Sequence, residues 1–329
     1  MRFVALAALV VIGATACSSG EETRPGSAST TAAPVTESTQ TASTSVPTPP
    51  SSAELVAMAC AGDLAWSVAG PLAGDLTSVS GLAAGRRDPD AVWAVEDSLE
   101  PADLVAIGVD GSELARIRVD AGPVSNLDWE AVSTTIGVDA VPLVVIGDVG
   151  DNFAFRRTVR FLVLDEPALD GDSTTSAVAP RVVEASYVDG TGAPVRPNAE
   201  AIVAQGDTVW VFDKSPSAPT TVYRGSLAGD STVLTPAATL DLAGEAVSDA
   251  SLSPDGRVLA LRTNRAIRLY PVSDSESLAD ALGGTPCNAP VPPEPQGEAV
   301  TILAGAAGLL TTSEDERGAA VDLHRIARR

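Results

Sequence analysis

Three glutamates recur at matching places in a repeated sequence, a pattern suited to holding a metal ion. Glu130, Glu200 and Glu298 each stand two or three residues into a short predicted strand, and Asp249 lies near the same place in a fourth. Several carboxylates that face one another cannot all stay ionised without a cation or arginines between them. Calcium suits such a group, because it accepts about six to eight oxygen ligands in flexible geometry. The pattern therefore predicts a carboxylate-bound Ca2+.

The stretch from residue 126 to residue 152 offers more oxygen ligands. It contains Asp128 before Glu130 and ends in a polar loop whose Asp148, Asp151 and Asn152 could add ligands. The spacing in this loop is not that of an EF-hand. The candidate metal ligands are therefore Asp128, Glu130, Asp148, Asp151, Asn152, Glu200, Asp249 and Glu298.

Two other interpretations of these carboxylates stay open at this point. Each carboxylate could cap the backbone of a neighbouring repeat or pair with one of the arginines Arg156, Arg157, Arg196 or Arg262. Of these arginines, Arg156, Arg157 and Arg262 are also candidate binding residues. Alternatively, two of the carboxylates could form a catalytic acid–base pair.

Other chemistries have little support in the residue counts. The single histidine, His324, falls on a predicted outer strand near the chain end, a poor place for the base of a Ser-His-Asp triad. One histidine also excludes histidine-rich zinc or iron sites. No glycine-rich phosphate loop follows a strand and opens a helix. The recurrent tryptophans Trp93, Trp129 and Trp210 are expected to pack between repeats, with stacking on a sugar as the alternative.

The elements that position the carboxylates form an internal repeat. Each unit has a short strand with a polar residue, a turn, a hydrophobic strand with a polar end, and another strand; the units begin near Ser80, Asp128, Asn198, Asp249 and Gly297. Units of about fifty residues made of short strands and turns are typical of β-propeller blades. The sequence predicts an all-β propeller with five blades. A sixth blade within the long second unit, or split between the two ends, is the alternative.

Composition agrees with this architecture. Hydrophobic residues make up 45% of the 329 residues but aromatic residues only 4%, so the core must consist mainly of Val, Leu, Ala and Ile. That composition favours short β-branched strands. Because the first strand of each blade lines the central channel of a propeller, the repeated carboxylates are expected at one mouth of that channel.

Closure of the propeller has its own sequence signals. Propellers often close when the first strand of the chain completes the last blade, and residues 65–71 are the candidate for that strand. The chain has three cysteines, and a disulfide between Cys60 and Cys287 would lock such a closure. Metal binding by these two cysteines is the alternative.

The amino terminus predicts export. Residues 1–16 combine a positive start with an apolar run too short to span a bilayer, and they end before Cys17. This resembles a bacterial lipoprotein signal, with alanine at a usual leucine position, which implies a lipid on Cys17; ordinary secretion is the alternative. Residues 17–53 are rich in Ser, Thr and Pro, and we expect a disordered tether. The propeller domain is then expected over residues 54–329.

Net charge limits the partners. The formal charge is −22, which repels phosphate backbones and argues against nucleic acid. The acidity could attract divalent cations or only improve solubility. We expect an extracytoplasmic monomer, lipid-anchored to the cell membrane, whose partner is an unknown envelope protein or glycan.

Several motifs together carry a family resemblance. Asp-Trp-Glu at 128–130, Gly-Asp-x-Gly-Asp-Asn at 147–152, Asn-Ala-Glu-Ala at 198–201, Ser-Pro-Asp-Gly at 253–256 and Gly-Glu-Ala at 297–299 resemble a group of exported bacterial propeller lipoproteins. That group looks distantly similar to calcium-dependent propellers, namely phytase-like esterases, gluconolactonases and paraoxonases. The resemblance implies calcium held by carboxylates on the propeller axis. The catalytic residues of those enzymes have no counterparts here.

Two function classes follow. The first is a non-enzymatic surface propeller that binds a partner, and the second is a calcium-dependent hydrolase of a phosphoester or lactone. The lack of a channel histidine and the single lysine, Lys214, favour the first class. The fold by itself does not decide, because propellers host both.

Overall fold

The computed structural model describes residues 50–73, 75–97, 102–123, 125–169, 177–314 and 321–329. The chain divides into two compact units, Met1–Pro47 and Thr48–Arg329, and the described residues all lie in the second. The expected signal peptide, Cys17 and nearly all of the expected tether therefore fall outside the described residues. None of the helices within these residues has the length and apolar character needed to cross a membrane.

The described residues form five four-stranded units that follow one another along the chain, the five blades of a propeller. Blade 1 contains β2 (Val79–Ala84), β3 (Ala91–Glu96), β4 (Asp103–Gly108) and β5 (Glu113–Arg118). Blade 2 contains β6 (Trp129–Ile136), β7 (Pro142–Asp148), β8 (Val159–Asp165) and β9 (Arg181–Val188). Blade 3 contains β11 (Ala199–Gln205), β12 (Thr208–Asp213), β13 (Thr220–Ser226) and β14 (Ser231–Leu240).

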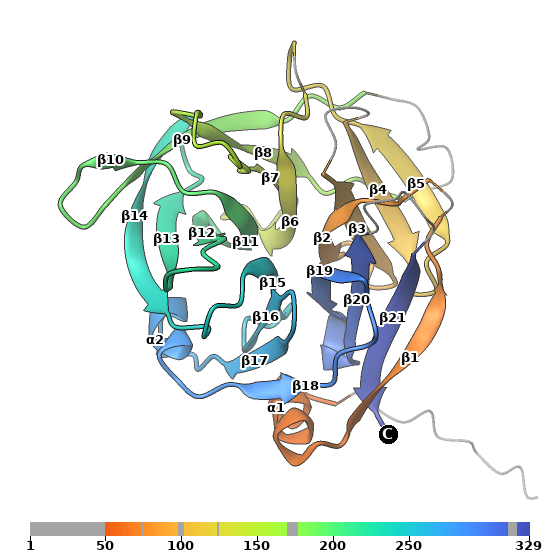
Figure 1. Ribbon diagram of the computed structural model, residues 1–329. Helices are drawn as coiled ribbons and strands as arrows, with labels where there is room; N and C mark the ends of the chain where they lie inside the picture. The colour runs from red at the N-terminus through yellow and green to blue at the C-terminus, as the bar shows by residue number, and fades with distance from the viewer. Residues whose placement is uncertain (1–49, 74, 98–101, 124, 170–176, 315–320) are drawn as a thin grey trace, which may run out of the picture. The chain divides into compact units, whose positions relative to one another are not determined.

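The last two blades complete the ring. Blade 4 contains β15 (Val247–Leu252), β16 (Val258–Thr263), β17 (Ile267–Pro271) and β18 (Cys287–Ala289). Blade 5 contains β19 (Gln296–Ile302), β20 (Leu309–Glu314), β21 (Asp322–Arg328) and β1 (Leu64–Pro71). Figure 1 shows the inner strands β2, β6, β11, β15 and β19 gathered around the centre. The predicted all-β propeller is confirmed, and its five blades correspond to the five sequence repeats.

The long second unit holds an extension rather than a sixth sheet among the described residues. The short strand β10 (Pro194–Val195) folds back on β9 as a hairpin. β9 also pairs in parallel with β14, the outer strand of blade 3. Blades 2 and 3 thereby join into one nine-stranded sheet.

The predicted closure is confirmed. β1 pairs antiparallel with β21 from Leu64 to Pro71, so the first strand of the domain completes the last blade. The helix α1 (Ser52–Ala61) precedes β1, and Cys60 at its end is disulfide-bonded to Cys287 in β18. The bond therefore links the entry of the domain to blade 4, next to the blade that β1 closes.

Helix α1 begins at Ser52, inside the range expected to be a disordered tether. Ser51 and Glu54 form a capping box, in which each side chain binds the other's backbone N–H. Leu55 and Ala59 bury one face of the helix in an apolar cluster of blades 4 and 5. Gly62, at φ 72°, ends the helix in the left-handed region that glycine favours. Two shorter helical turns, α2 (Leu278–Leu282) and η1 (Ala304–Ala306), lie in loops.

The core lies between the blades. Five clusters of buried apolar residues occupy the five interfaces between successive blades. Trp93 of blade 1 and Trp129 of blade 2 are both fully buried in one of these clusters, and Trp210 lies in the cluster between blades 3 and 4. The expectation that these tryptophans pack between repeats is confirmed.

Candidate metal centre

Each of the five inner strands carries a β-bulge at the same place. The pairing between the first and second strands of every blade skips one residue, and the skipped residues are Ser80, Glu130, Glu200, Ser248 and Glu298. A bulge redirects the side chain of its extra residue out of the regular alternation. The repeated bulge therefore gives three glutamates and two serines equivalent positions around the channel. The glutamates are nearly buried, with exposures of 3%, 3% and 6% in chain order.

Glu130 belongs to a compact group of three carboxylates. Oxygen atoms of Asp97, Asp128 and Glu130 all lie within 4.8 Å of one another. Asp97 directly follows β3, and Asp128 directly precedes β6. We call these three residues the carboxylate trio. Its spacing is that of ligands around a single cation.

Gly150 allows the trio to form. A Cβ atom at this position would lie 2.3 Å from Asp128 Oδ2 and 2.8 Å from Glu130 Oε1. Both distances are shorter than real carbon–oxygen contacts, and a glycine backbone is needed where groups approach this closely. The backbone of the loop after β7 therefore packs directly against the trio.

Burial raises the pKa of each member of the trio, and neighbouring carboxyl charges add to the shift for Asp128 and Glu130. Burial raises the pKa of Asp97, and burial followed by the charge of Asp97 raises the pKa of Asp128 to about 6. Burial, then the charge of Glu200, raises the pKa of Glu130 well above its ordinary range. A cation among these oxygens would remove the repulsion and allow all three groups to ionise.

Glu130 receives no hydrogen bond from a nitrogen donor in the described part of the chain. Its side chain is 3% exposed, and the groups that act on it most strongly are the carboxyls of Glu200, Asp97 and Asp128. A buried carboxylate normally has a charged or hydrogen-bonding partner, because burial without one is costly. Glu130 thus shares a hydrogen bond with Glu200 and has Lys214 as a favourable charge, but carboxyl groups dominate its surroundings.

The other two ring glutamates have a cation of their own. Lys214 Nζ lies 3.2 Å from Glu200 Oε2. Burial acts to lower the pKa of Lys214, but the charges of Glu200 and Glu298 outweigh it and raise that pKa. Burial raises the pKa of Glu200 to about 7 although Lys214 opposes the shift. Gln296 donates a hydrogen bond to Glu298. Lys214 therefore pairs directly with Glu200, and its charge also lowers the pKa values of Glu130 and Asp97 in the trio.

The carboxylates at the end of β7 and in the loop after it stabilise that segment itself. Asp148 is buried and forms ion pairs with Arg156, at 2.8 Å, and with Arg160. Asp151 accepts hydrogen bonds from the N–H groups of Phe155 and Arg156, at 2.9 and 3.0 Å. Asn152 accepts one from Asn198 at 3.0 Å. These three predicted ligands lie outside the trio, which the loop reaches through Gly150.

Asp249 ties three blades together. It stands one residue past the bulge position and is fully buried. Its Oδ2 accepts hydrogen bonds from Val300 N of blade 5 at 2.8 Å and from Leu82 N of blade 1 at 3.4 Å. Asp249 therefore caps the backbone of two neighbouring blades, which is the alternative to metal binding that the sequence left open. Burial raises the pKa of Asp249 well above its ordinary range.

The candidate binding arginines have different surroundings. Arg156 is buried in the ion pair with Asp148, and Arg262 is buried in an ion pair with Glu294. A Cβ atom at Gly297 would fall 1.5 Å from a guanidinium nitrogen of Arg262, so this glycine admits the side chain. Arg157 alone is exposed, and no ion pair joins it to a described residue.

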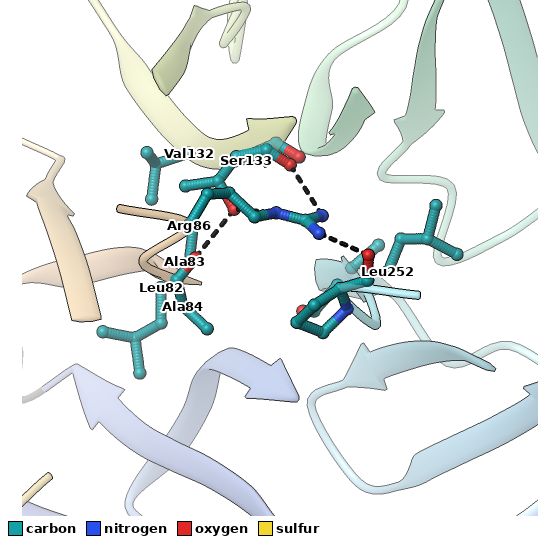
Figure 2. A pocket seen from close by; sticks show the side chains of 11 residues that line it. Leu82, Ala83, Ala84, Arg86, Val132, Ser133 and Leu252 are labelled. Atoms are coloured by element: carbon teal, nitrogen blue, oxygen red, sulfur yellow. Dashed lines mark hydrogen bonds between the residues drawn. The ribbon is translucent and has the colours of Figure 1, made fainter. Parts of the chain in front are cut away.

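At the other end of the channel, where the inner strands end, Arg86 fills the space between the blades. Arg86 donates hydrogen bonds to Pro254 O of blade 4 at 2.6 Å and to Thr134 Oγ1 of blade 2 at 3.2 Å. Figure 2 shows this side chain reaching across the space between the blades. The cavity beside it has about 10 Å³, room for roughly one water molecule. At the carboxylate end, by contrast, a hollow of about 320 Å³ is lined by Lys214, Glu298 and Asn264 among others. A ligand would therefore enter from the carboxylate end.

Two residues of this end were absent from the predicted site. Asp97 and Lys214 directly follow the second strands of blades 1 and 3, and their N–H groups bond to Ser78 O and Asn198 O respectively. These are equivalent places in the repeat, just as the bulges are. An alignment of the repeats at the ends of their second strands would have indicated both.

The comparisons with known proteins give distant structural likenesses. No family model matches the chain, and no curated protein matches it. Among solved structures, the crystal structure of RRP9 WD40 repeats gives a TM-score of 0.43 at 11% identity, over 82% of this chain and 98% of that one. A structure of U3-55K gives 0.43 at 11% identity, over 81% and 99%.

Proposed function

We propose that this protein is an extracytoplasmic, membrane-anchored propeller that acts as a binding or scaffold module and carries Ca2+ at the carboxylate trio. The observation that carries the metal proposal is Glu130, a buried carboxylate on which the charges of three neighbouring carboxyl groups act more strongly than the charge of Lys214. Asp97 and Asp128 supply the further oxygens. Hard oxygen ligands of this kind are those that calcium prefers.

The chemistry of the trio fits a calcium ion that keeps open positions. Three carboxylates give three to six oxygens, and calcium takes about six to eight, so water or a ligand would complete the shell. An ion there would stabilise the ionised form of Asp128, whose pKa is about 6 without one. Calcium binding at about pH 6 and below should therefore release protons.

Anchoring and export have separate support. The lipoprotein-like segment that ends at Cys17 implies a lipid, and residues 17–53 have the composition of a tether. The Cys60–Cys287 disulfide suits an oxidising compartment outside the cytoplasm. The partner in this proposal is an envelope protein or glycan, bound by a monomer.

A calcium-dependent hydrolase of a phosphoester or lactone is the second candidate. The observation in its favour is a carboxyl with a pKa of about 6, Asp128, within a possible metal group that lies at the open end of the channel. Such a group could act as a base beside a metal that polarises the substrate. Hydrolysis of a phosphoester or lactone that requires calcium and is lost in Asp128→Asn would favour this candidate over the scaffold.

Calorimetric titration with Ca2+ tests the metal proposal. At about pH 6 the wild-type chain should bind one ion and release protons, which the dependence of the heat on buffer ionisation measures. Asp97→Asn should weaken binding at least about tenfold, or about 1.4 kcal/mol, since it removes one of three charged ligands. Glu184→Gln changes an exposed glutamate on β9 and should bind as the wild type does. Equal affinities for all three proteins would contradict the proposed ligand set.

A further inference from the structure

The loop between β7 and β8 holds two phenylalanines in solvent. Phe153 is 86% exposed and Phe155 is 62% exposed, and the chain has only five phenylalanines. Single exposed apolar residues are common on protein surfaces and need no explanation. Two large aromatic side chains on one short turn form a patch of the kind that marks interaction sites.

Buried polar groups fix this turn. Asp151, itself 3% exposed, accepts the N–H groups of Phe155 and Arg156, and its own carbonyl accepts the N–H of Ala154 at 2.9 Å. Below the turn, Arg156 donates to Gly150 O and pairs with Asp148. The exposure of the two phenylalanines therefore comes from a supported conformation rather than from a loose loop.

The turn also contains local strain. Ala154, between the two phenylalanines, has φ 52°, in the left-handed region that residues with a side chain rarely adopt. Such strain persists only where the surrounding structure enforces it, and it concentrates at functional positions. A turn that is strained and supported presents its aromatic side chains already ordered, which lowers the entropy lost on binding.

A pocket with two arginines adjoins the turn. It has about 380 Å³ and apolar walls that include Tyr187, Val188 and Val195, and its charged lining residues are Arg157 and Arg196. Arg196 donates a hydrogen bond to Ala154 O at 3.2 Å, so the pocket and the turn are joined. Neither arginine forms an ion pair with a described residue, although the chain carries a charge of −22.

Tyr187 lines the pocket and carries a buried hydroxyl. Its side chain is 4% exposed, and its hydroxyl has no hydrogen-bond partner among the described residues. A buried hydroxyl without a partner is uncommon in native structures. Because the hydroxyl itself is buried in the cluster between blades 2 and 3, Tyr187 contributes a wall to the pocket rather than a group that binds the ligand.

We infer that Phe153, Phe155, Arg157, Arg196 and the pocket beside them form a docking surface for an acidic peptide segment of another protein. The two arginines bind its carboxylates, and the pocket takes one of its apolar side chains while the phenylalanines cover the next. This inference rests on the proposed binding-module function and names the binding face and the chemistry of the partner.

A lipid surface fits these observations less well. Exposed aromatic residues beside arginines also occur where proteins touch anionic membranes. A pocket of about 380 Å³, however, suits a single side chain rather than the flat surface of a bilayer. Binding to lipid vesicles is therefore measured as the alternative.

The test measures fluorescence anisotropy of a short labelled peptide that alternates glutamate with leucine and phenylalanine. Two control peptides carry lysine in place of glutamate, or serine in place of the apolar residues. The full chain should bind the first peptide saturably and bind the controls at least about tenfold more weakly. The same chain is mixed with vesicles of phosphatidylglycerol and phosphatidylcholine, to which it should not bind.

Variants assign the binding to this surface. Phe153→Ser and Arg196→Ser should each weaken peptide binding at least about tenfold without a change in melting temperature, because both side chains are exposed. Val138→Ser alters a residue that is 77% exposed in the β6–β7 loop and should leave binding unchanged. No saturable binding, equal binding of the lysine peptide, or binding only to vesicles would overturn the inference.

The calcium proposal and this inference can fail separately. Peptide binding is measured in EDTA and in Ca2+, and again with Glu130→Gln, which alters the trio but not the docking surface. The inference expects binding of the acidic peptide under all three conditions. Loss of the calcium response with retained peptide binding would therefore reject only the metal proposal.

Discussion

At the scale of single residues, the same side-chain type has opposite roles within one short segment. Glu130 joins the trio, whereas Asp148, which lies opposite Trp129 on the neighbouring strand, is neutralised by Arg156 and Arg160. The difference lies in whether an arginine reaches the carboxylate. Ion pairs of this kind depend on tertiary position, so carboxylate spacing in the sequence cannot separate ligands from structural residues.

Asp128 gives the trio a testable pH dependence. Its pKa is raised to about 6, so the folded chain binds more protons than the unfolded chain between about pH 4 and pH 6. This group therefore costs stability progressively as the pH rises through that window in EDTA. Asp128→Asn, which stays neutral, should gain free energy of unfolding relative to the wild type from pH 4 to pH 7. Urea titrations at both pH values measure the difference, and a constant difference would contradict the buried, repelled carboxyl.

Asp249 predicts a structural effect without a metal effect. Asp249→Ala leaves N–H groups of Val300 and Leu82 without their acceptor and should cost about 2–4 kcal/mol of unfolding free energy. Asp139→Ala, in an exposed loop, is the control and should change stability by less than about 0.5 kcal/mol. Calcium affinity of Asp249→Asn should equal that of the wild type. A large loss of calcium affinity would instead place Asp249 among the ligands.

At the scale of elements, the bulged inner strands decide which residues meet. Each bulge turns one residue out of an otherwise regular hairpin, and the loop after β7 then closes against two trio members through Gly150. The repeat made the positions of Glu130, Glu200 and Glu298 predictable, because equivalent strands place equivalent residues together. The contributions of Asp97 and Lys214 come from strand ends, where no alternation of apolar and polar residues marks their direction.

Gly150→Ala tests whether calcium binding requires the loop backbone to approach the trio this closely. The added Cβ would meet Asp128 and Glu130, so calcium affinity should fall at least about tenfold as the carboxylates move apart. Gly190→Ala is the matched control, since a Cβ there meets nothing within 4 Å. Calorimetry on both variants gives the comparison. Unchanged affinity in Gly150→Ala would mean that the ion does not require the observed packing.

At the scale of the whole domain, the closure by β1 and the disulfide were both predictable. Two cysteines near the ends of the domain, and a strand-like segment before the first repeat, carry that information in the sequence. Helix α1 was missed because it is short and follows a low-complexity segment. Its capping box of Ser51 and Glu54 was the available signal.

Reduction should destabilise the closed ring. The disulfide spans 227 residues, for which the loop-entropy relation gives an upper value of about 5 kcal/mol. The double variant Cys60→Ser, Cys287→Ser should melt several degrees below the wild type, and reductant should lower the wild-type melting temperature to a similar value. If neither treatment changed the melting temperature, the bond would have no part in holding the closure.

The most direct test of the central claim is a thermal melt of the full chain in EDTA, in 1 mM Ca2+ and in 1 mM Mg2+. With a dissociation constant of about 10 μM, calcium should add about 2.7 kcal/mol, a rise of about 5 °C or more. Magnesium should give a much smaller rise, and Glu130→Gln should abolish the calcium effect. Equal melting temperatures in EDTA and Ca2+, or a calcium shift that survives Glu130→Gln, would contradict a metal centre at the trio.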